Sequence, residues 1–189
     1  VEDRWGDPVD LDKVAEAINA HPDAKVLAFV HAETSTGVRS DAQQLCALAK
    51  SAGMLTIVDA VTSLAGIDLQ VDGWLADVVY SGTQKCLSSL PGIAPITFSP
   101  DAVAAISART HRVQSWFLDM NLIMGYWGEG STRAYHHTAP VNAIYALHES
   151  LLMLEEEGLE ASFARHKANH LRLVEGLSRL GLGLSLIHI

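Results

Sequence analysis

Two ionisable residues, Asp59 and Lys85, each follow a short apolar run that is typical of a buried β-strand. Residues 55–58 lead directly into the aspartate, and residues 78–80 precede the lysine by a few small or polar positions. Open α/β sheets bind ligands at the carboxyl ends of their strands, so we expect both side chains at that edge. A lysine there can form a Schiff base, and an aspartate can hold a protonated pyridine nitrogen. A lysine and an aspartate in these two roles are the minimum that chemistry with pyridoxal 5'-phosphate (PLP) requires.

Both residues also have an ordinary interpretation. Lys85 alone would be a solvated residue at the edge of a sheet, and Asp59 alone would be a turn or capping residue, or a magnesium ligand. The neighbours of Lys85 favour chemistry, because Ser81 and Gly82 are small enough to let a ligand approach closely. The apolar strand before Lys85 also predicts that its amine lies near apolar walls, where the neutral and nucleophilic form is favoured.

Two further segments carry hydroxyl groups. Residues 31–37 (HAETSTG) follow an expected strand and form either a plain turn or a place where hydroxyls and backbone N–H groups meet a ring oxygen or a phosphate. Glu33 in this loop either pairs with a substrate or is simply solvated. Tyr135 and Thr138 lie just before an expected helix, which is a favourable place for a phosphate. No metal is expected there, because His136 and His137 lack partners at zinc spacing.

The alternation of strand and helix patterns predicts an α/β fold with a mainly parallel sheet flanked by helices. Asp10 and Ser40 are the expected N-caps of two helices, and Pro140 suits the first turn of a third. Residues 113–135 are rich in aromatic residues and glycine without a clear period, so we expect a partly ordered loop there. Strands are predicted over 25–31, 54–59, 76–80 and 94–99, and helices over 11–20, 41–52, 102–108, 140–157 and 159–180.

The composition excludes some functions. A formal net charge of −9 argues against a nucleic-acid surface, which needs a basic patch. No apolar run approaches the roughly 20 residues that a membrane span requires, and no secretory signal is recognisable, so we expect a cytoplasmic protein without a membrane partner. Of the two cysteines, Cys46 fits a buried helical position, and Cys86 stays unassigned beside Lys85.

Four segments together resemble a known family: HAETSTGV (31–38), IVDAVTSLAG (57–66), YSGTQKCLSSLPG (80–92) and YHHTAP (135–140). In this order and spacing they are similar to the class V, fold type I PLP aminotransferases of the alanine–glyoxylate and serine–glyoxylate (serine–pyruvate) group. The resemblance extends from about residue 10 to residue 182.

The resemblance implies roles for individual residues. Lys85 would be the Schiff-base lysine, and Asp59 would bond the pyridine nitrogen. Val61 would pack on one face of the ring, Thr34 would lie near the ring hydroxyl, and Gln84 would contact the phosphate.

Two residues would act across a dimer interface. Tyr135 and Thr138 would reach the phosphate held by the neighbouring subunit, so the resemblance implies a homodimer with a shared active site. We also expect a chain truncated at both ends, because the family's amino-terminal phosphate loop and its carboxyl-terminal substrate-binding arginine have no counterpart here. Residues 1–158 would then belong to the PLP-binding large domain, and residues 159–189 would lead toward a mostly missing small domain.

The implied reaction is transamination between a small amino acid, alanine or serine, and glyoxylate or pyruvate. Transfer from ureidoglycine to glyoxylate is an open alternative. A lyase resembling the cysteine desulfurases is a second, although such enzymes normally have a histidine where this chain has Gln84. A third is a folded but inactive fragment that binds no cofactor.

Overall fold

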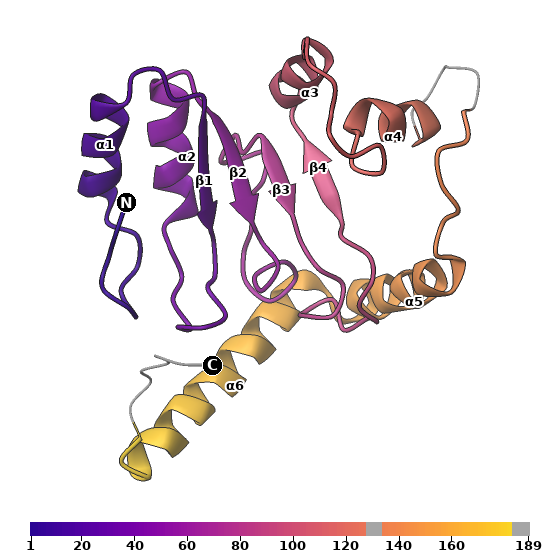
Figure 1. The fold of residues 1–189 in the computed structure, drawn as a ribbon. Coiled ribbons are helices and arrows are strands. Elements are labelled where there is room, and N and C mark those ends of the chain that lie inside the picture. The colour runs from indigo at the N-terminus through magenta and orange to yellow at the C-terminus, as the bar shows by residue number, and fades with distance from the viewer. Residues whose placement is uncertain (128–133, 183–189) are drawn as a thin grey trace.

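A four-stranded sheet forms the centre of the computed structural model, which describes residues 1–127 and 134–182 (Figure 1). The strand order is β1-β2-β3-β4, in which the first three strands are parallel and β4 is antiparallel to β3. The strands are β1 (Val26–Val30), β2 (Leu55–Asp59), β3 (Val78–Tyr80) and β4 (Ile96–Phe98). The predicted α/β fold with a mainly parallel sheet is therefore confirmed, and each predicted strand is present in a slightly shorter form.

Helices α1 (Leu11–Ala20) and α2 (Ala42–Ser51) lie side by side on one side of the sheet (Figure 1). Asp10 caps α1 as predicted, since its carboxylate accepts hydrogen bonds from the backbone N–H groups of residues 12 and 13. The prediction that Ser40 caps α2 is wrong. Asp41 is the cap and accepts from the Gln44 N–H at 3.0 Å, whereas the buried Ser40 hydroxyl accepts from the N–H of Val9.

The strands present alternate residues to the two faces of the sheet. Val58 and Val79 point to the face covered by α2, where they pack with Cys46 in the buried core. Cys46 is fully buried, as predicted for a small apolar side chain. Asp59 and Tyr80 come next along β2 and β3, so their half-buried side chains point to the opposite face.

A buried carboxylate, Asp77, joins the end of α2 to the starts of β2, β3 and α3. It accepts hydrogen bonds from the Lys50 ammonium at 2.9 Å, the Thr56 N–H at 2.9 Å and the Ser99 hydroxyl at 2.8 Å. Burial alone would raise the pKa of Asp77, but the hydrogen bonds from Lys50 and Ser99 outweigh it and hold that pKa below its usual value. The charge is therefore retained in the interior because it is paired.

Two short helices follow β4: α3 (Pro100–Ser107) and α4 (Met120–Trp127). Ser99 caps α3 by accepting from the Ala102 N–H at 3.1 Å. Helix α4 corrects the prediction of a loop over 113–135. Its sequence MNLIMGYW is apolar almost all round, so it lacks the periodicity from which an amphipathic helix is recognised. Residues 128–133 of that predicted loop lie outside the described part of the chain.

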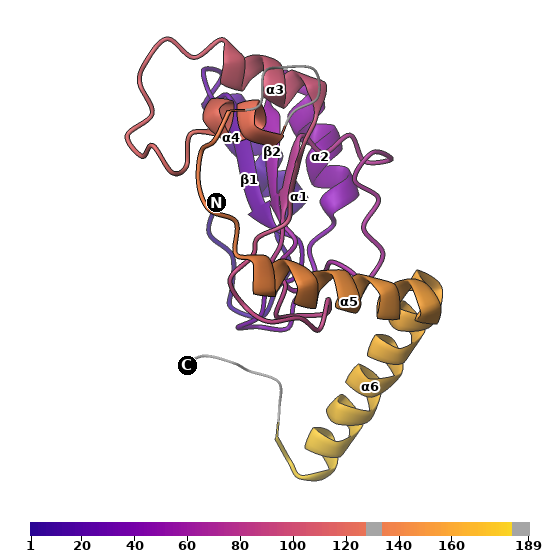
Figure 2. The same cartoon turned by 90° about the vertical axis from the view of Figure 1, so that its right-hand side faces the viewer.

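Two long helices complete the described chain, α5 (Val141–Glu157) and α6 (Leu159–Arg179), joined at Gly158. Both match their predicted extents, although Pro140 is the N-cap residue of α5 and not part of its first turn. The carboxyl ends of β1, β2 and β3 point toward these helices, and α6 projects away from the sheet (Figures 1 and 2). Among the described residues, no helix is long and apolar enough to span a membrane.

Candidate functional site

Asp59 is the last residue of β2 and lies at the carboxyl edge of the sheet. Its Oδ1 accepts the Val61 N–H at 2.9 Å, and its Oδ2 accepts the hydroxyl of Tyr80 at 2.6 Å. Tyr80 is the residue paired with Asp59 in the parallel register between β2 and β3. The hydrogen bond to the carboxylate, together with burial, raises the pKa of Tyr80 to about 12, so the phenol stays a donor.

Lys85 lies in a turn beyond the end of β3, and the backbone of this turn is firmly bonded. The buried Thr83 donates its hydroxyl to the Leu90 carbonyl, and its own carbonyl accepts the Ser89 N–H at 2.9 Å. The Lys85 carbonyl accepts the Ser88 N–H at 2.9 Å. Hydrogen bonds among residues 83–90 thus fix the backbone of this turn.

The expected apolar surroundings of Lys85 are wrong for this chain, because its side chain is exposed, as is that of Gln84. The reason is that the apolar run ends at Tyr80, and the turn that follows carries Lys85 beyond the walls of the core strand.

Thr62 connects the loop after β1, the loop after β2 and the Lys85 turn. Its hydroxyl is 2.6 Å from the hydroxyl of Thr34, and its carbonyl accepts the Cys86 thiol at 3.3 Å. Thr34 is exposed, and Val61, next to Thr62, is half-buried. Through these bonds the structure brings Asp59, Val61, Thr34 and the Lys85 turn to one edge of the sheet.

Cys86 packs inward while its neighbour Lys85 points out. A Cβ placed on Gly66 would lie 2.5 Å from the Cys86 sulfur, so only glycine allows this close approach. Burial raises the pKa of the Cys86 thiol, which disfavours the reactive thiolate. Cys86 therefore anchors the Lys85 turn against the loop after β2.

Helix α6 supports the same edge from outside. The hydroxyl of Ser162, a fully buried residue, donates to the Ala65 carbonyl at 2.8 Å. One turn further, His166 Nδ1 donates to the Ser162 backbone carbonyl at 2.8 Å, and the His166 ring lies beside Gly66. The loop that follows Asp59 is consequently fixed between the sheet and α6.

Glu33 bonds within its own loop. Its Oε1 accepts both the N–H and the hydroxyl of Ser35, at 2.9 and 2.8 Å, and these bonds hold the pKa of the Glu33 carboxyl below its usual range. In this structure Glu33 therefore shapes the 33–37 turn, a use that neither expectation named.

Tyr135 and Thr138 bond to each other, with their hydroxyl oxygens 2.5 Å apart, and both are exposed. Within residues 1–127 and 134–182, no hydrogen bond links this pair to Asp59 or to the Lys85 turn. The described hydrogen bonds therefore join the two hydroxyls to each other and not to the edge that carries Asp59.

The rings of the adjacent residues His136 and His137 form hydrogen bonds within the chain. His136 is buried against Trp116, whose backbone carbonyl lies 2.9 Å from Nε2, and its Nδ1 lies 2.7 Å from Nδ1 of His137. A carbonyl can only accept, so Nε2 of His136 is the donor in that bond. In the part of the chain that the structure describes, no group of three potential metal ligands is found.

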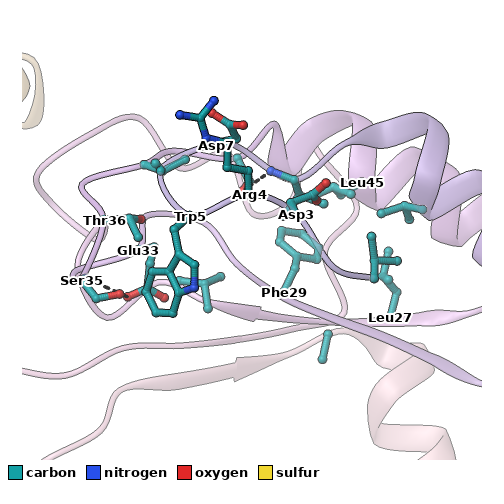
Figure 3. A pocket seen from close by; sticks show the side chains of 18 residues that line it. Asp3, Arg4, Trp5, Asp7, Leu27, Phe29, Glu33, Ser35, Thr36 and Leu45 are labelled. Carbon is teal, nitrogen blue, oxygen red and sulfur yellow. Dashed lines mark hydrogen bonds between the residues drawn. The ribbon is translucent and has the colours of Figure 1, made fainter. Parts of the chain in front are cut away.

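A hollow of about 420 Å³ lies between the amino-terminal segment, β1 and the loop that follows β1 (Figure 3). Trp5, Phe29, Glu33 and Thr36 line it, and Asp59 and Lys85 do not. It has an aromatic wall but lacks the lysine and carboxylate that the predicted chemistry requires. We therefore assign the candidate site to the sheet edge and not to this hollow.

The donor set at the edge fits PLP. An amine, a carboxylate and a hydroxyl come from three separate segments, the Lys85 turn, the end of β2 and the loop after β1, and they match the aldehyde, the ring nitrogen and the ring hydroxyl of that cofactor. Two residues of this edge were missed by the sequence reasoning, Tyr80 and Thr62. Tyr80 could have been suspected from its place at the end of a strand, but its pairing with Asp59 depends on the strand register.

The family model "Aminotransferase class-V" matches residues 5–186. Alanine–glyoxylate aminotransferase of Oryctolagus cuniculus is 40% identical over 175 residues, which are 92% of this chain and 44% of that protein. The crystal structure of alanine–glyoxylate aminotransferase from Nostoc sp. superposes with a TM-score of 0.91 at 42% identity, over 97% of this chain and 48% of that one.

A third match has a different substrate in its name. The crystal structure of ureidoglycine–glyoxylate aminotransferase from Bacillus subtilis gives a TM-score of 0.89 at 35% identity, over 96% of this chain and 46% of that one. In all three comparisons the chain spans less than half the length of the protein that it matches.

Proposed function

Since the chain belongs to the class-V aminotransferase family, we propose that the complete protein containing it transfers an amino group between alanine or serine and glyoxylate or pyruvate, with PLP as cofactor. The observation that carries the proposal is the Asp59 carboxylate, held by two donors at the sheet edge beside the turn that bears Lys85. A fixed carboxylate is what a protonated pyridine nitrogen requires as a partner.

PLP supplies an electron sink that makes the Cα proton of a bound amino acid removable. The residues of this chain would hold and orient it. Asp59 would receive the ring N–H, Thr34 would donate to the ring hydroxyl, and Val61 would cover one face of the ring. Gln84 would reach the phosphate from the position before Lys85.

Lys85 would carry the cofactor covalently and, once released, its Nζ would move a proton between the substrate and the cofactor. The bonded backbone of the turn fixes where this side chain begins, and its exposure leaves the side chain free to move. A positioned general base of this kind contributes roughly 10²–10⁴-fold to a rate.

Tyr135 and Thr138 would bind the phosphate of a second subunit. Both hydroxyls are exposed and close together at the start of α5, so they can face a partner. The proposal therefore includes a homodimer in which each site is completed by the other chain.

Ureidoglycine is the second candidate as amino donor. The observation in its favour is the Bacillus subtilis relative, which covers nearly all of this chain. The residues at the sheet edge hold the cofactor and do not select between donors, so the two substrates are separated by assay.

A cysteine-dependent lyase finds less support in this chain. The sulfur of Cys86 is bonded to the Thr62 carbonyl, and Cys46 is fully buried in the core. Neither thiol is presented as an exposed nucleophile beside Lys85.

The test is an absorption spectrum of the complete protein with added PLP, before and after borohydride, followed by peptide mapping and by donor assays with glyoxylate. We expect a visible band, reduction onto Lys85, and no labelled peptide in Lys85→Ala. Activity with alanine or serine supports the first candidate, and activity only with ureidoglycine supports the second. Absence of any band, or labelling at another lysine, would refute the assignment and favour a non-catalytic scaffold.

A further inference from the structure

The hydroxyl of Tyr80 bonds the one carboxylate that would set the electronic state of the cofactor. Asp59 and Tyr80 are register partners at the ends of two parallel strands, so their side chains leave the same face of the sheet next to each other. The distance of 2.6 Å between Tyr80 Oη and Asp59 Oδ2 is short, as expected for a hydrogen bond to an ionised acceptor.

The two oxygens of Asp59 have different donors. Oδ1 accepts from the Val61 backbone and Oδ2 accepts from Tyr80. The terminal torsion of an aspartate is otherwise broad, so a carboxylate with one donor can still rotate. Donors on both oxygens fix its plane, and each oxygen keeps capacity for a further hydrogen bond.

Tyr80 also remains a donor under all working conditions. Its hydrogen bond to Asp59, with burial, raises the pKa of Tyr80 to about 12, so the phenol carries its proton throughout the neutral range. Tyr80 therefore donates its hydroxyl to the Asp59 carboxylate at any pH at which an enzyme of this family would work.

We propose that Tyr80 is a positioning residue, whose hydroxyl holds the Asp59 carboxylate in the orientation that receives the protonated ring nitrogen of PLP. The inference rests on the proposed function. It makes Tyr80 act through Asp59 and through the ring nitrogen alone, not through the phosphate, the aldehyde or the general stability of the sheet.

This route can be isolated with a cofactor analogue. In 1-deazapyridoxal 5'-phosphate a carbon replaces the ring nitrogen, and the aldehyde and phosphate are kept. Dissociation constants for PLP and for this analogue are measured by absorbance titration of the complete apoprotein. The variants are Tyr80→Phe, which keeps the ring and removes the hydroxyl, and Tyr145→Phe, which removes the hydroxyl of an exposed tyrosine on α5 as the matched control.

For Tyr80→Phe we expect the Kd for PLP to rise about tenfold, the lower end of what a hydrogen bond to a charged group contributes. The Kd for the deaza analogue should stay within about twofold, because the analogue has no ring N–H for Asp59 to receive. Tyr145→Phe should change neither constant. Tyr80→Gln retains an N–H donor and should recover part of the lost affinity for PLP.

Equal weakening of both cofactors by Tyr80→Phe would overturn the inference, since it would show a general structural effect. No weakening of either would overturn it as well. Circular dichroism of each apoprotein verifies that the variants are folded, and Tyr80→Leu, which also lacks a donor, carries the same comparison if the phenylalanine variant is not. If the unsubstituted protein binds no PLP, the proposed function itself fails, which is distinct from a failure confined to the Tyr80 variants.

Discussion

His31 should make the stability of this protein fall as the pH drops from neutral. It is the first residue after β1, it is only 2% exposed, and its ring meets Trp74 edge-on at 5.4 Å. Among the described residues its Nδ1 has no hydrogen-bond partner. Burial, with a smaller contribution from the charge of Arg39, lowers the pKa of His31 from 6.5 to about 4.

The sign follows from which state binds the proton. The unfolded chain protonates His31 near pH 6.5, whereas the folded chain resists protonation until about pH 4. The stability is therefore complete above pH 6.5 and is lost progressively as the pH falls toward 4. At 1.36 kcal/mol per pKa unit, the whole interval corresponds to about 3 kcal/mol, of which about 2 kcal/mol should be lost between pH 7 and pH 5.

The assay is urea denaturation at pH 7 and at pH 5, a range that stays above the titration of ordinary carboxylates. The comparison is between the unsubstituted protein, His31→Gln, and His148→Gln, which removes an exposed histidine from α5. The unsubstituted protein and the His148 variant should share the loss of stability, and His31→Gln should lack about 2 kcal/mol of it. An unchanged pH dependence in His31→Gln would refute the argument.

Three further predictions concern contacts that hold the sheet and the loops at its carboxyl edge. Gly66→Ala places a Cβ 2.5 Å from the Cys86 sulfur and should cost about 1–3 kcal/mol in urea denaturation, most of which Cys86→Ala should restore; equal costs in both backgrounds would disprove the contact. Asp77→Asn should lower the free energy of unfolding by about 2 kcal/mol, because the buried network loses its negative charge and one of its two acceptor oxygens, and a change below about 0.5 kcal/mol would contradict this. Ser162→Ala should cost about 1 kcal/mol and lower the Tm by about 2–4 °C, since the Ala65 carbonyl loses its donor; an unaltered Tm would show that this bond contributes nothing.

Local patterns were sufficient for most of the secondary structure. Asp10 capped the expected helix because an aspartate before an amphipathic run satisfies the free N–H groups of the first turn. The same logic placed the second cap one residue early, since Ser40 and Asp41 are both good caps and only tertiary contact occupies the serine hydroxyl. Helix α4 was missed because an apolar run with glycine shows no face.

The candidate site, like the secondary structure, could be predicted from the sequence only in part. Asp59 could be placed at the carboxyl edge because its strand is continuous and the connection to the next strand is parallel. Its partner Tyr80 could not, because a hydrogen bond between two strands depends on a register that neither strand encodes alone. The role of Thr62 was hidden for a similar reason, since its contacts with Thr34 and Cys86 span more than 20 residues of sequence each.

The exposure of Lys85 illustrates how a turn can fix a residue without burying it. Thr83 and Cys86 on either side point inward and bond to the loops around them, so the backbone of the turn has little freedom. Lys85 lies between them and is exposed. The role proposed above for Lys85, holding a cofactor and then releasing it, would use this combination of a fixed backbone and an exposed side chain. The position of Lys85 is thus set by the contacts of its neighbours. Substitutions at Thr83, Cys86 or Gly66 should therefore shift Lys85 even though its own side chain is unchanged.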